Sequence, residues 1–254
     1  IGAVDFLEKP KVNVASELPR YTMALQDKIR AAAVAQLGKM EPKKKEVTER
    51  LSALATNWEH LTFKTNHLVA IGASTGGTEA IKEVISRLPA HFPPVIITQH
   101  IPPVFSTTFA ARLDLLSSMT VYEAEDGQKL EPGCVYIAPG DEHLKLEKKG
   151  SYFYCRLERS ELVNRHRPAV DVMFNSIPDE YVKKCTAAIL TGMGSDGAVG
   201  LKRLKDLGAF TITQSEDSCV VYGMPKAADD IGASTKSIAL DKIAQTLVQA
   251  AVKK

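Results

Sequence analysis

The sequence lacks the features of membrane, secreted and nucleic-acid-binding proteins. No apolar run approaches the roughly 20 residues that span a bilayer. Residues 1–5 lack the basic and long apolar regions of a signal peptide, and they lack an initiator Met. The formal net charge is only +2, so no overall field favours nucleic acid or a membrane surface as a partner. We therefore expect a cytoplasmic protein without nucleic-acid binding or membrane insertion, whose numbering begins inside a longer chain.

Cysteine is scarce and widely spaced. The four cysteines are Cys134, Cys155, Cys185 and Cys219, and no two of them form a CxxC pair. The spacing of a metal site is therefore absent, and no metal is expected. Spacing alone leaves disulfides open, but free thiols in a reducing cytosol are the simpler interpretation.

What the sequence does contain is an alternation of short apolar runs and helical patterns from about Asn66 onward. The predicted strands are residues 68–71, 95–98, 120–123, 135–138, 187–190, 211–213 and 237–240. The predicted helices are residues 78–88, 104–116, 169–177, 197–207 and 241–252. Residues 144–157 alternate, turn and alternate again, as in an antiparallel β-hairpin. The expected fold is α/β: a doubly wound, mainly parallel sheet with helices on both faces and this hairpin inserted.

The region before Asn66 has a different character. Tyr21, Leu25, Ile29 and Ala33 recur at the spacing of one helix face, and Gly38 is a plausible end to that helix. Residues 42–46 (Pro-Lys-Lys-Lys-Glu) are charged and have no apolar period. They predict either a solvated linker or a basic docking patch.

Residues 67–78 are the most informative stretch. An apolar run ends in glycines and small hydroxyl residues, and apolar side chains then recur at helical spacing from Ile81 to Leu88. This predicts a strand, a tight turn that carries Ser74, and a helix. Such a turn can present a serine hydroxyl above the sheet as a nucleophile. It can also direct the amides of a helix N-terminus at an anion.

Two other predicted strands also end in polar residues. His100 follows the strand at 95–98, and Asp196 lies in a glycine-rich turn after the strand at 187–190. The carboxyl ends of parallel strands share one edge of the sheet, where ligands bind in open α/β folds. Ser74, His100 and Asp196 are therefore expected to meet there as nucleophile, general base and the group that orients the base.

Each of the three residues also has a simpler structural interpretation. Ser74 fits a tight turn because it is small, and a histidine before a proline often serves only as a hydrogen-bonding residue. Asp196 is a natural N-cap for the helix at 197–207. The occurrence of all three at strand ends favours the catalytic interpretation.

Other known motifs fit the turn only in part. Residues 72–76 have the Gly-x-Ser-x-Gly spacing of a nucleophile elbow, but elbow enzymes place the acid before the histidine, whereas here Asp196 follows His100. A dinucleotide fingerprint requires glycine in place of Ser74 and an acidic residue after the second strand. A P-loop requires lysine where Thr78 stands. No cofactor is expected.

Residues 164–171 (Asn-Arg-His-Arg-Pro-Ala-Val-Asp) are dense in functional groups. Asp171 favours the N-terminus of the following helix, and alternatively Arg165 or Arg167 contacts an acidic substrate surface. The histidines outside the proposed site show no ligand spacing and are interpreted as structural or surface residues: His60, His67, His91, His143 and His166.

Four motifs, in this order, resemble those of the bacterial chemotaxis protein-glutamate methylesterases, the CheB family. They are residues 72–77 (Gly-Ala-Ser-Thr-Gly-Gly), 99–102 (Gln-His-Ile-Pro), 167–171 (Arg-Pro-Ala-Val-Asp) and 192–197 (Gly-Met-Gly-Ser-Asp-Gly). Ile101 departs from the methionine associated with the family, at a position without a chemical role. The resemblance implies a doubly wound α/β domain that hydrolyses γ-glutamyl methyl esters on the signalling helices of chemotaxis receptors. Some family members also deamidate receptor glutamines.

The resemblance also implies roles for single residues. Ser74 is the nucleophile, His100 the base and Asp196 the orienting acid. Main-chain amides at Thr75 and Met193 are expected to hold the oxyanion. Two other classes stay open from the residues alone: a non-enzymatic α/β ligand- or partner-binding signalling module, and a general carboxylesterase.

The N-terminus resembles the last strand and helix of a response-regulator receiver domain, with Lys9 in the position of the lysine that contacts an aspartyl phosphate. The earlier strands and the phosphoacceptor aspartate are not in this sequence. We therefore expect residues 1–38 to be a receiver remnant that cannot be phosphorylated, 39–65 an interdomain linker and 66–254 the catalytic domain. A chemotaxis histidine kinase would be a partner through the missing receiver domain.

Overall fold

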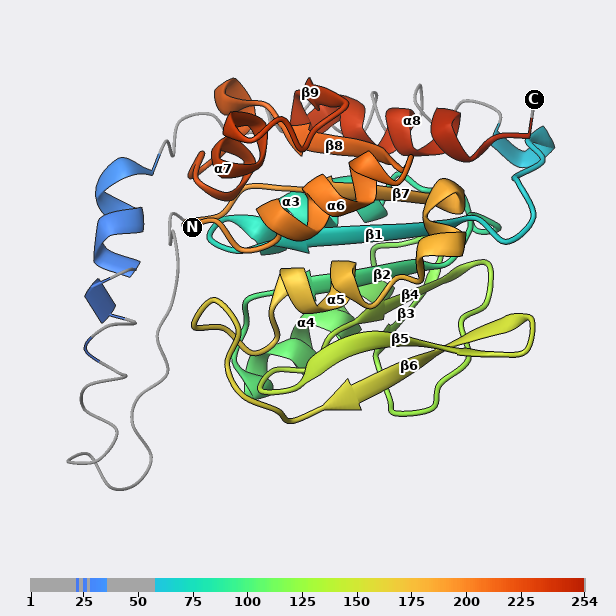
Figure 1. The fold of residues 1–254 in the computed structure, drawn as a ribbon, viewed down its shortest axis with the longest axis horizontal. Helices are drawn as coiled ribbons and strands as arrows, with labels where there is room; N and C mark the ends of the chain where they lie inside the picture. Colours follow the sequence, from blue (N-terminus) through green and yellow to red (C-terminus); the bar gives the residue numbers. More distant parts are fainter. Residues whose placement is uncertain (1–21, 23–24, 27, 36–57, 254) are drawn as a thin grey trace.

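The computed structural model describes residues 22, 25–26, 28–35 and 58–253 (Figure 1). The predicted receiver strand with Lys9, the basic stretch at 42–46 and most of the predicted linker lie outside the described residues. The text below concerns only the described part of the chain.

A seven-stranded parallel sheet forms the centre of the fold, with strand order β3-β4-β2-β1-β7-β8-β9. Its strands are β1 (Leu68–Ala73), β2 (Val95–Gln99), β3 (Thr120–Glu123), β4 (Cys134–Ile137), β7 (Cys185–Ile189), β8 (Phe210–Gln214) and β9 (Lys236–Ile238). Strands β5 (His143–Lys149) and β6 (Tyr152–Glu158) form a separate antiparallel hairpin. The predicted fold class is confirmed, and every predicted sheet strand is present with its ends within two residues of the expected positions.

Helices cover both faces of the sheet (Figure 1). Helices α3 (Gly77–Ile85), α4 (Pro103–Asp114) and α8 (Leu240–Ala251) contribute to one core, whereas α5 (Val170–Asn175), α6 (Ala198–Asp206), α7 (Met224–Asp230) and the hairpin contribute to the other. Strand β1 divides its side chains between the two: Val69 and Ile71 enter the first core, and Leu68 and Ala70 the second. This explains its nearly continuous apolar sequence, because a strand covered on both faces has no wet side.

Helix α7 was not predicted. It has only seven residues, with a proline at its second position, and this leaves too short a pattern for a helical period to show. Short 3-10 helices lie at Trp58–His60 (η2), Asp179–Lys184 (η3) and Glu216–Ser218 (η4), and the last two were likewise not predicted.

The packed domain extends to residues before the expected boundary at Asn66. Phe63 forms a β-bridge with Val252, and Trp58 and Phe63 pack against the core that contains α3 and α8. The last part of the predicted linker is thus fixed to the C-terminal helix. All four cysteines are free.

A helical segment over residues 28–34 lies against the domain (Figure 1). Its contact is made by the fully buried Ala31, which clusters with Val220 and Val221 beside Met193. Leu25 and Ile29, which recur on one predicted helix face, are exposed. Ala31 is small, so it allows the helix to approach these loops closely.

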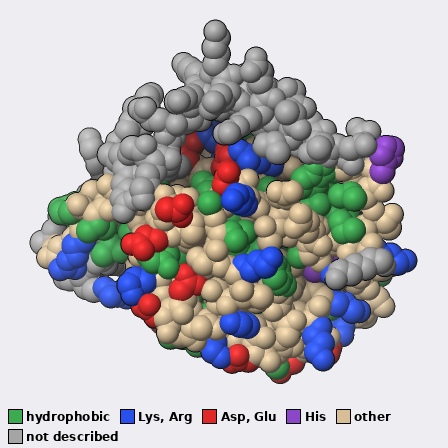
Figure 2. Space-filling model, turned by 90° about the horizontal axis from the view of Figure 1, so that it is seen from above, with side chains coloured by type: hydrophobic (Ala, Val, Ile, Leu, Met, Phe, Trp, Pro, Cys, Tyr) green, Lys and Arg blue, Asp and Glu red, His purple; other side chains and the backbone are tan. Residues whose placement is uncertain are grey.

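The surface agrees with the nearly balanced charge. On the face shown in Figure 2, Lys and Arg side chains are interspersed with Asp, Glu and apolar side chains and form no single large basic patch. None of the helices in the described ranges combines the length and the apolarity that crossing a bilayer requires.

Candidate active site

The site lies where the sheet reverses its winding. Strand β1 has β2 on one side and β7 on the other, so the turns after these three strands meet at the carboxyl edge of the sheet. Each turn supplies one predicted residue: Ser74, His100 and Asp196. A crevice forms at such a switch point because the connections leave in opposite directions.

Backbone hydrogen bonds hold the turn that carries Ser74. The Ser74 N–H donates to Thr191 O at 3.0 Å, and the Gly77 N–H donates to Ser74 O at 2.7 Å. Gly76 has φ +79°, a left-handed conformation that favours glycine. On the other side Gly192 packs so closely that an added Cβ would lie 2.7 Å from Ser74 Cβ. The turn therefore has one conformation and little room to move.

His100 links the other two residues. Its Nδ1 lies 3.1 Å from Ser74 Oγ, and its Nε2 lies 2.7 Å from Asp196 Oδ2. Trypsin-like enzymes use the same ring in the opposite sense, with Nε2 toward serine. Either nitrogen can accept a proton while the other donates one. The side chains of His100 and Asp196 are only 7% and 2% exposed, so this chain of hydrogen bonds is shielded from water.

The Asp196 carboxylate receives four hydrogen bonds. Besides His100, the donors are Val170 N–H (2.7 Å), Asp171 N–H (3.1 Å) and Asn164 Nδ2 (2.7 Å). Burial by itself raises the pKa of Asp196, but hydrogen bonding and attraction to His100, with the other donors, outweigh it and leave the pKa below its ordinary value. The carboxylate is therefore held ionised and in a fixed orientation.

The N-cap interpretation of Asp196 is wrong for its own helix. Gly197 is the N-cap of α6 and makes no side-chain capping bond, whereas the Asp196 carboxylate accepts the first N–H groups of α5. Asp171, which was expected to favour its own helix, instead accepts the Gly200 N–H of α6 at 2.7 Å. Each aspartate thus accepts backbone N–H groups at the start of the other's helix, and the pair fixes α5 against α6.

The Ser74 turn itself and the turn after β7 carry the expected oxyanion donors, Thr75 and Met193. Thr191 Oγ1 donates to Thr75 O at 3.0 Å and accepts the Val221 N–H at 2.9 Å. The next turn, with Met193, is held because Gly192 O accepts two backbone N–H groups from residues 223 and 224. Thr75 and Met193 therefore belong to connected, well-anchored turns. Their role as donors remains a prediction.

The sequence model described as CheB methylesterase matches residues 69–247, well over half of the chain. The chain belongs to the CheB methylesterase family.

Relatives of known name support this membership. The chain is 47% identical over 253 residues to protein-glutamate methylesterase/protein-glutamine glutaminase 2 of Saccharophagus degradans, which covers 100% of this chain and 72% of that protein. It is 42% identical over 254 residues to the protein of the same name from Pseudomonas aeruginosa, covering 100% of this chain and 70% of that protein. The solved CheB methylesterase catalytic domain of Thermotoga maritima is 41% identical, with a TM-score of 0.71, over 73% of this chain and 99% of that one.

His166 is a site residue of this CheB-family chain that the sequence did not reveal. Its ring stacks on His100, with centroids 3.6 Å apart and an interplanar angle of 14°. Burial, and then the charge of His100, lower the pKa of His166 to about 3, so it remains neutral. It covers one face of the base without adding a charge. Its sequence position between two arginines gave no signal of this contact.

The two arginines differ in their surroundings. Arg167 is largely buried, and its guanidinium binds Asp141 at 2.7 Å and Ser160 O. Arg167 thus holds the loop before α5, next to a cis peptide bond with Pro168. Arg165 is exposed and lies next to His166 in the chain. Of the two, Arg165 is placed better to meet a substrate, and that role stays a prediction.

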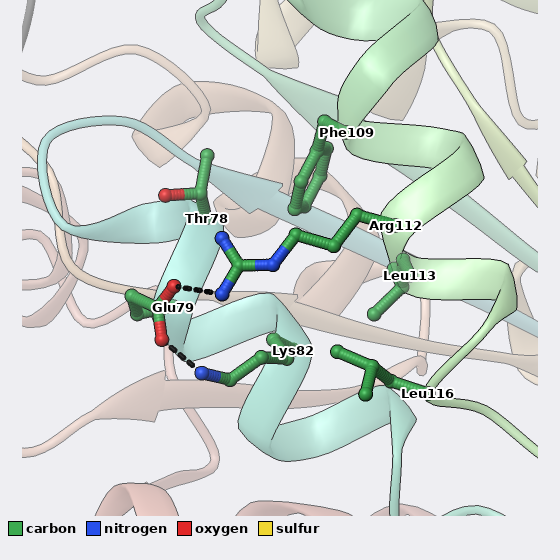
Figure 3. Close-up of a pocket in the computed structure, with 7 residues that line it drawn as sticks. All are labelled: Thr78, Glu79, Lys82, Phe109, Arg112, Leu113 and Leu116. Carbon is green, nitrogen blue, oxygen red and sulfur yellow. Dashed lines mark hydrogen bonds and ion pairs between the residues drawn. The ribbon is translucent and has the colours of Figure 1, made fainter.

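Two cavities lie away from the site, and neither is lined by Ser74, His100 or Asp196. One, of about 10 Å³, lies between α3 and α4, where Arg112 of α4 approaches Glu79 of α3 at 3.4 Å (Figure 3). It has room for no more than about one water. A larger one, of about 600 Å³, includes His67 and Pro94, which precede β1 and β2, and so lies at the opposite edge of the sheet. Within the described ranges, no group of three or more His, Cys, Asp or Glu side chains is arranged to hold a metal.

Proposed function

We propose that this chain hydrolyses glutamate γ-methyl esters on chemotaxis receptors, giving glutamate and methanol, with Ser74, His100 and Asp196 as its catalytic triad. The observation that carries the proposal is the continuous line of hydrogen bonds from Ser74 Oγ through His100 to Asp196 at the switch point of the sheet. The names of the relatives from Saccharophagus degradans and Pseudomonas aeruginosa supply the substrate class.

The first half of the reaction transfers the acyl group to the enzyme. Ser74 Oγ attacks the ester carbonyl carbon while His100 Nδ1 takes the hydroxyl proton. The imidazolium that forms is stabilised by the Asp196 carboxylate at Nε2. The N–H groups of Thr75 and Met193 receive the negative oxygen, a contribution worth about 10²–10³ in rate for each donor. The ester C–O bond then breaks, and Nδ1 returns the proton to the methoxy oxygen, releasing methanol.

The second half repeats these steps with water. His100 Nδ1 removes a proton from water as its oxygen attacks the acyl-Ser74 carbonyl. When the intermediate collapses, the proton goes to Ser74 Oγ, and the receptor glutamate leaves. The same sequence with ammonia as leaving group would deamidate glutamine, and the second part of the relatives' name makes this a second candidate activity.

The domain assignment and the partners are parts of the same proposal. Residues 1–38 correspond to the end of a receiver domain, 39–65 to a linker whose last part packs on the catalytic domain, and 66–254 to the catalytic domain. The receptor's signalling helices are the substrate, and a chemotaxis histidine kinase would act on the complete receiver domain in the cytoplasm. The chain spans 72% and 70% of the length of the two relatives from Saccharophagus degradans and Pseudomonas aeruginosa.

Methanol release from methylated receptor tests the proposal directly. We expect release by the unmodified chain and its loss in Ser74→Ala, with the fold unchanged by circular dichroism. Undiminished release in this variant would disprove the nucleophile assignment. A fluorophosphonate probe separates an esterase from a binding module. Labelling of Ser74 that disappears in His100→Ala supports the enzyme, whereas no labelling together with tight binding of a small anion supports the module. Rapid hydrolysis of small soluble esters would indicate a general carboxylesterase.

A further inference from the structure

Gln99 ends β2 immediately before the base, and its side chain lies against the nucleophile turn. The residue is only 4% exposed, and in the sheet it is paired with Ala73. Its Nε2 donates to Ser74 O at 2.9 Å and to His100 O at 3.1 Å. One carboxamide thus holds the backbone of the nucleophile and the backbone of the base.

The two acceptors determine which end of the carboxamide faces them. Both are carbonyl oxygens, and only the NH₂ end of a glutamine has protons to give. A hydroxyl of similar reach carries a single proton, and an ionised carboxylate carries none. Among uncharged side chains of this length, the double contact is specific to glutamine.

The contact with Ser74 O has a consequence for the neighbouring amide. A trans peptide unit is planar, and its C=O and N–H point in opposite directions. Gln99 and the Gly77 N–H fix the direction of Ser74 O. They therefore also fix the direction of the Thr75 N–H, which is the expected oxyanion donor.

The space around the other end of the carboxamide is adapted to it. A Cβ added at Gly77 would lie 2.1 Å from Gln99 Oε1, so only glycine leaves room for this rotamer. Oε1 is buried and has no hydrogen-bond partner in the described part of the chain. An unpaired buried acceptor costs free energy. The molecule keeps the side chain in this orientation despite that cost.

We propose that Gln99 is a positioning residue that orients the Thr75 amide and holds the Ser74 turn at a fixed distance from His100. This inference rests on the proposed esterase function. It concerns the geometry of the transition state, so removing the NH₂ group should lower kcat and leave KM nearly unchanged.

The test compares Gln99→Met with Tyr136→Phe. Methionine keeps the length and apolar contacts of the side chain but loses both donated hydrogen bonds. Tyr136→Phe removes a buried hydroxyl that also makes two hydrogen bonds, to Lys129 O and Glu131 N, away from the three catalytic turns. Each variant loses two buried hydrogen bonds. A difference between their rates is therefore not a general effect of lost hydrogen bonds on stability.

We expect Gln99→Met to lower kcat for methanol release on the order of 10–100-fold, part of the effect of losing a whole oxyanion donor. The rate of fluorophosphonate labelling of Ser74 should fall by a similar factor, because that reaction uses the same donors. In Gln99→Glu, a protonated carboxyl would recover one donor. The ratio of its rate to that of Gln99→Met should therefore rise as the pH is lowered.

The outcomes separate this inference from the function on which it rests. If the unmodified chain is labelled at Ser74 but releases no methanol, the proposed substrate is wrong and the labelling rates still decide the role of Gln99. If Gln99→Met keeps kcat and labelling within about threefold of Tyr136→Phe, the positioning role is disproved. If KM rises while kcat is unchanged, Gln99 affects binding and the inference also fails. Absence of labelling in the unmodified chain would overturn both.

Discussion

Asp196, which precedes α6, accepts hydrogen bonds from the first turn of α5. Asp171, which lies in α5, accepts one from the first turn of α6. Asp196 takes the Val170 N–H of α5 at 2.7 Å, and Asp171 takes the Gly200 N–H of α6 at 2.7 Å. Asn164 Nδ2 joins both carboxylates, at 2.7 Å each. The proposed orienting acid is thus part of a rigid junction between two helices.

Asp196→Asn should lower kcat for methanol release by about 10⁴-fold, because the histidine tautomer would no longer be fixed. All four partners of the carboxylate donate hydrogen bonds, so an amide NH₂ must oppose at least one of them. Kinetics of methanol release would measure the loss. Asp206→Asn, which removes a carboxylate from an exposed pair with Lys202, serves as the charge-matched control. An effect of only a fewfold would return Asp196 to a purely structural role.

Replacing His166 should reveal what the stacked ring contributes. In His166→Ala one face of His100 becomes open to water, and we expect kcat to fall on the order of tenfold as the base loses its fixed position. His166→Phe restores an uncharged planar ring and should recover most of the rate. Equal losses in both variants would show that a polar atom of His166, and not its ring stacking, is what matters.

Gly192→Ala should impair catalysis more than stability. An added Cβ would lie 2.5 Å from Met224 Sδ, 2.7 Å from Ser74 Cβ and 3.0 Å from Ser74 N, so the packing of the Gly192 turn on the nucleophile turn must change. A displacement of about 1 Å can cost on the order of 10²-fold in rate. Gly150→Asn, in the hairpin turn where nothing lies within 4 Å of an added Cβ, is the control. Methanol release and thermal unfolding would be measured for both, and an unaltered rate in Gly192→Ala would contradict this view of the turn.

His67 should make the fold less stable in mild acid. Burial, and then the charge of Lys64, lower the pKa of His67 to about 4 from 6.5. The unfolded chain therefore binds the proton more tightly, and the free energy of unfolding falls as the pH decreases from 6.5 toward 4, while it is unaffected above that range. Each pKa unit corresponds to about 1.4 kcal/mol, so the loss at pH 5 is about 1–2 kcal/mol.

Urea unfolding of His67→Asn at pH 7.5 and pH 5 would measure this contribution. The variant should lose less stability on acidification than the unmodified chain. His60→Asn, which replaces an exposed histidine, should leave the pH dependence unchanged. A His67→Asn variant with the same pH dependence as the unmodified chain would show that His67 is protonated equally in both states.

The sequence predicted the architecture well because the signals were local. The runs that became β1, β2 and β7 are buried on both sides, and the helix between β1 and β2, α3, has a clear period. The hairpin followed from its alternation and its turn at Gly150. Helix α7 was missed because a seven-residue segment beginning Met-Pro carries too little periodic information.

The sequence by itself determined the fold class, the family resemblance and the three residues at the strand ends, because each depends on the order of residues along single segments. Only the tertiary structure decided which contacts these residues make. In the structure Nδ1 of His100 faces Ser74, and His166 stacks on His100. Asp196 accepts the first N–H groups of α5 and does not cap α6. Such contacts join segments 26 to 96 positions apart in the chain, so they depend on how helices and turns pack and leave no pattern in a single segment.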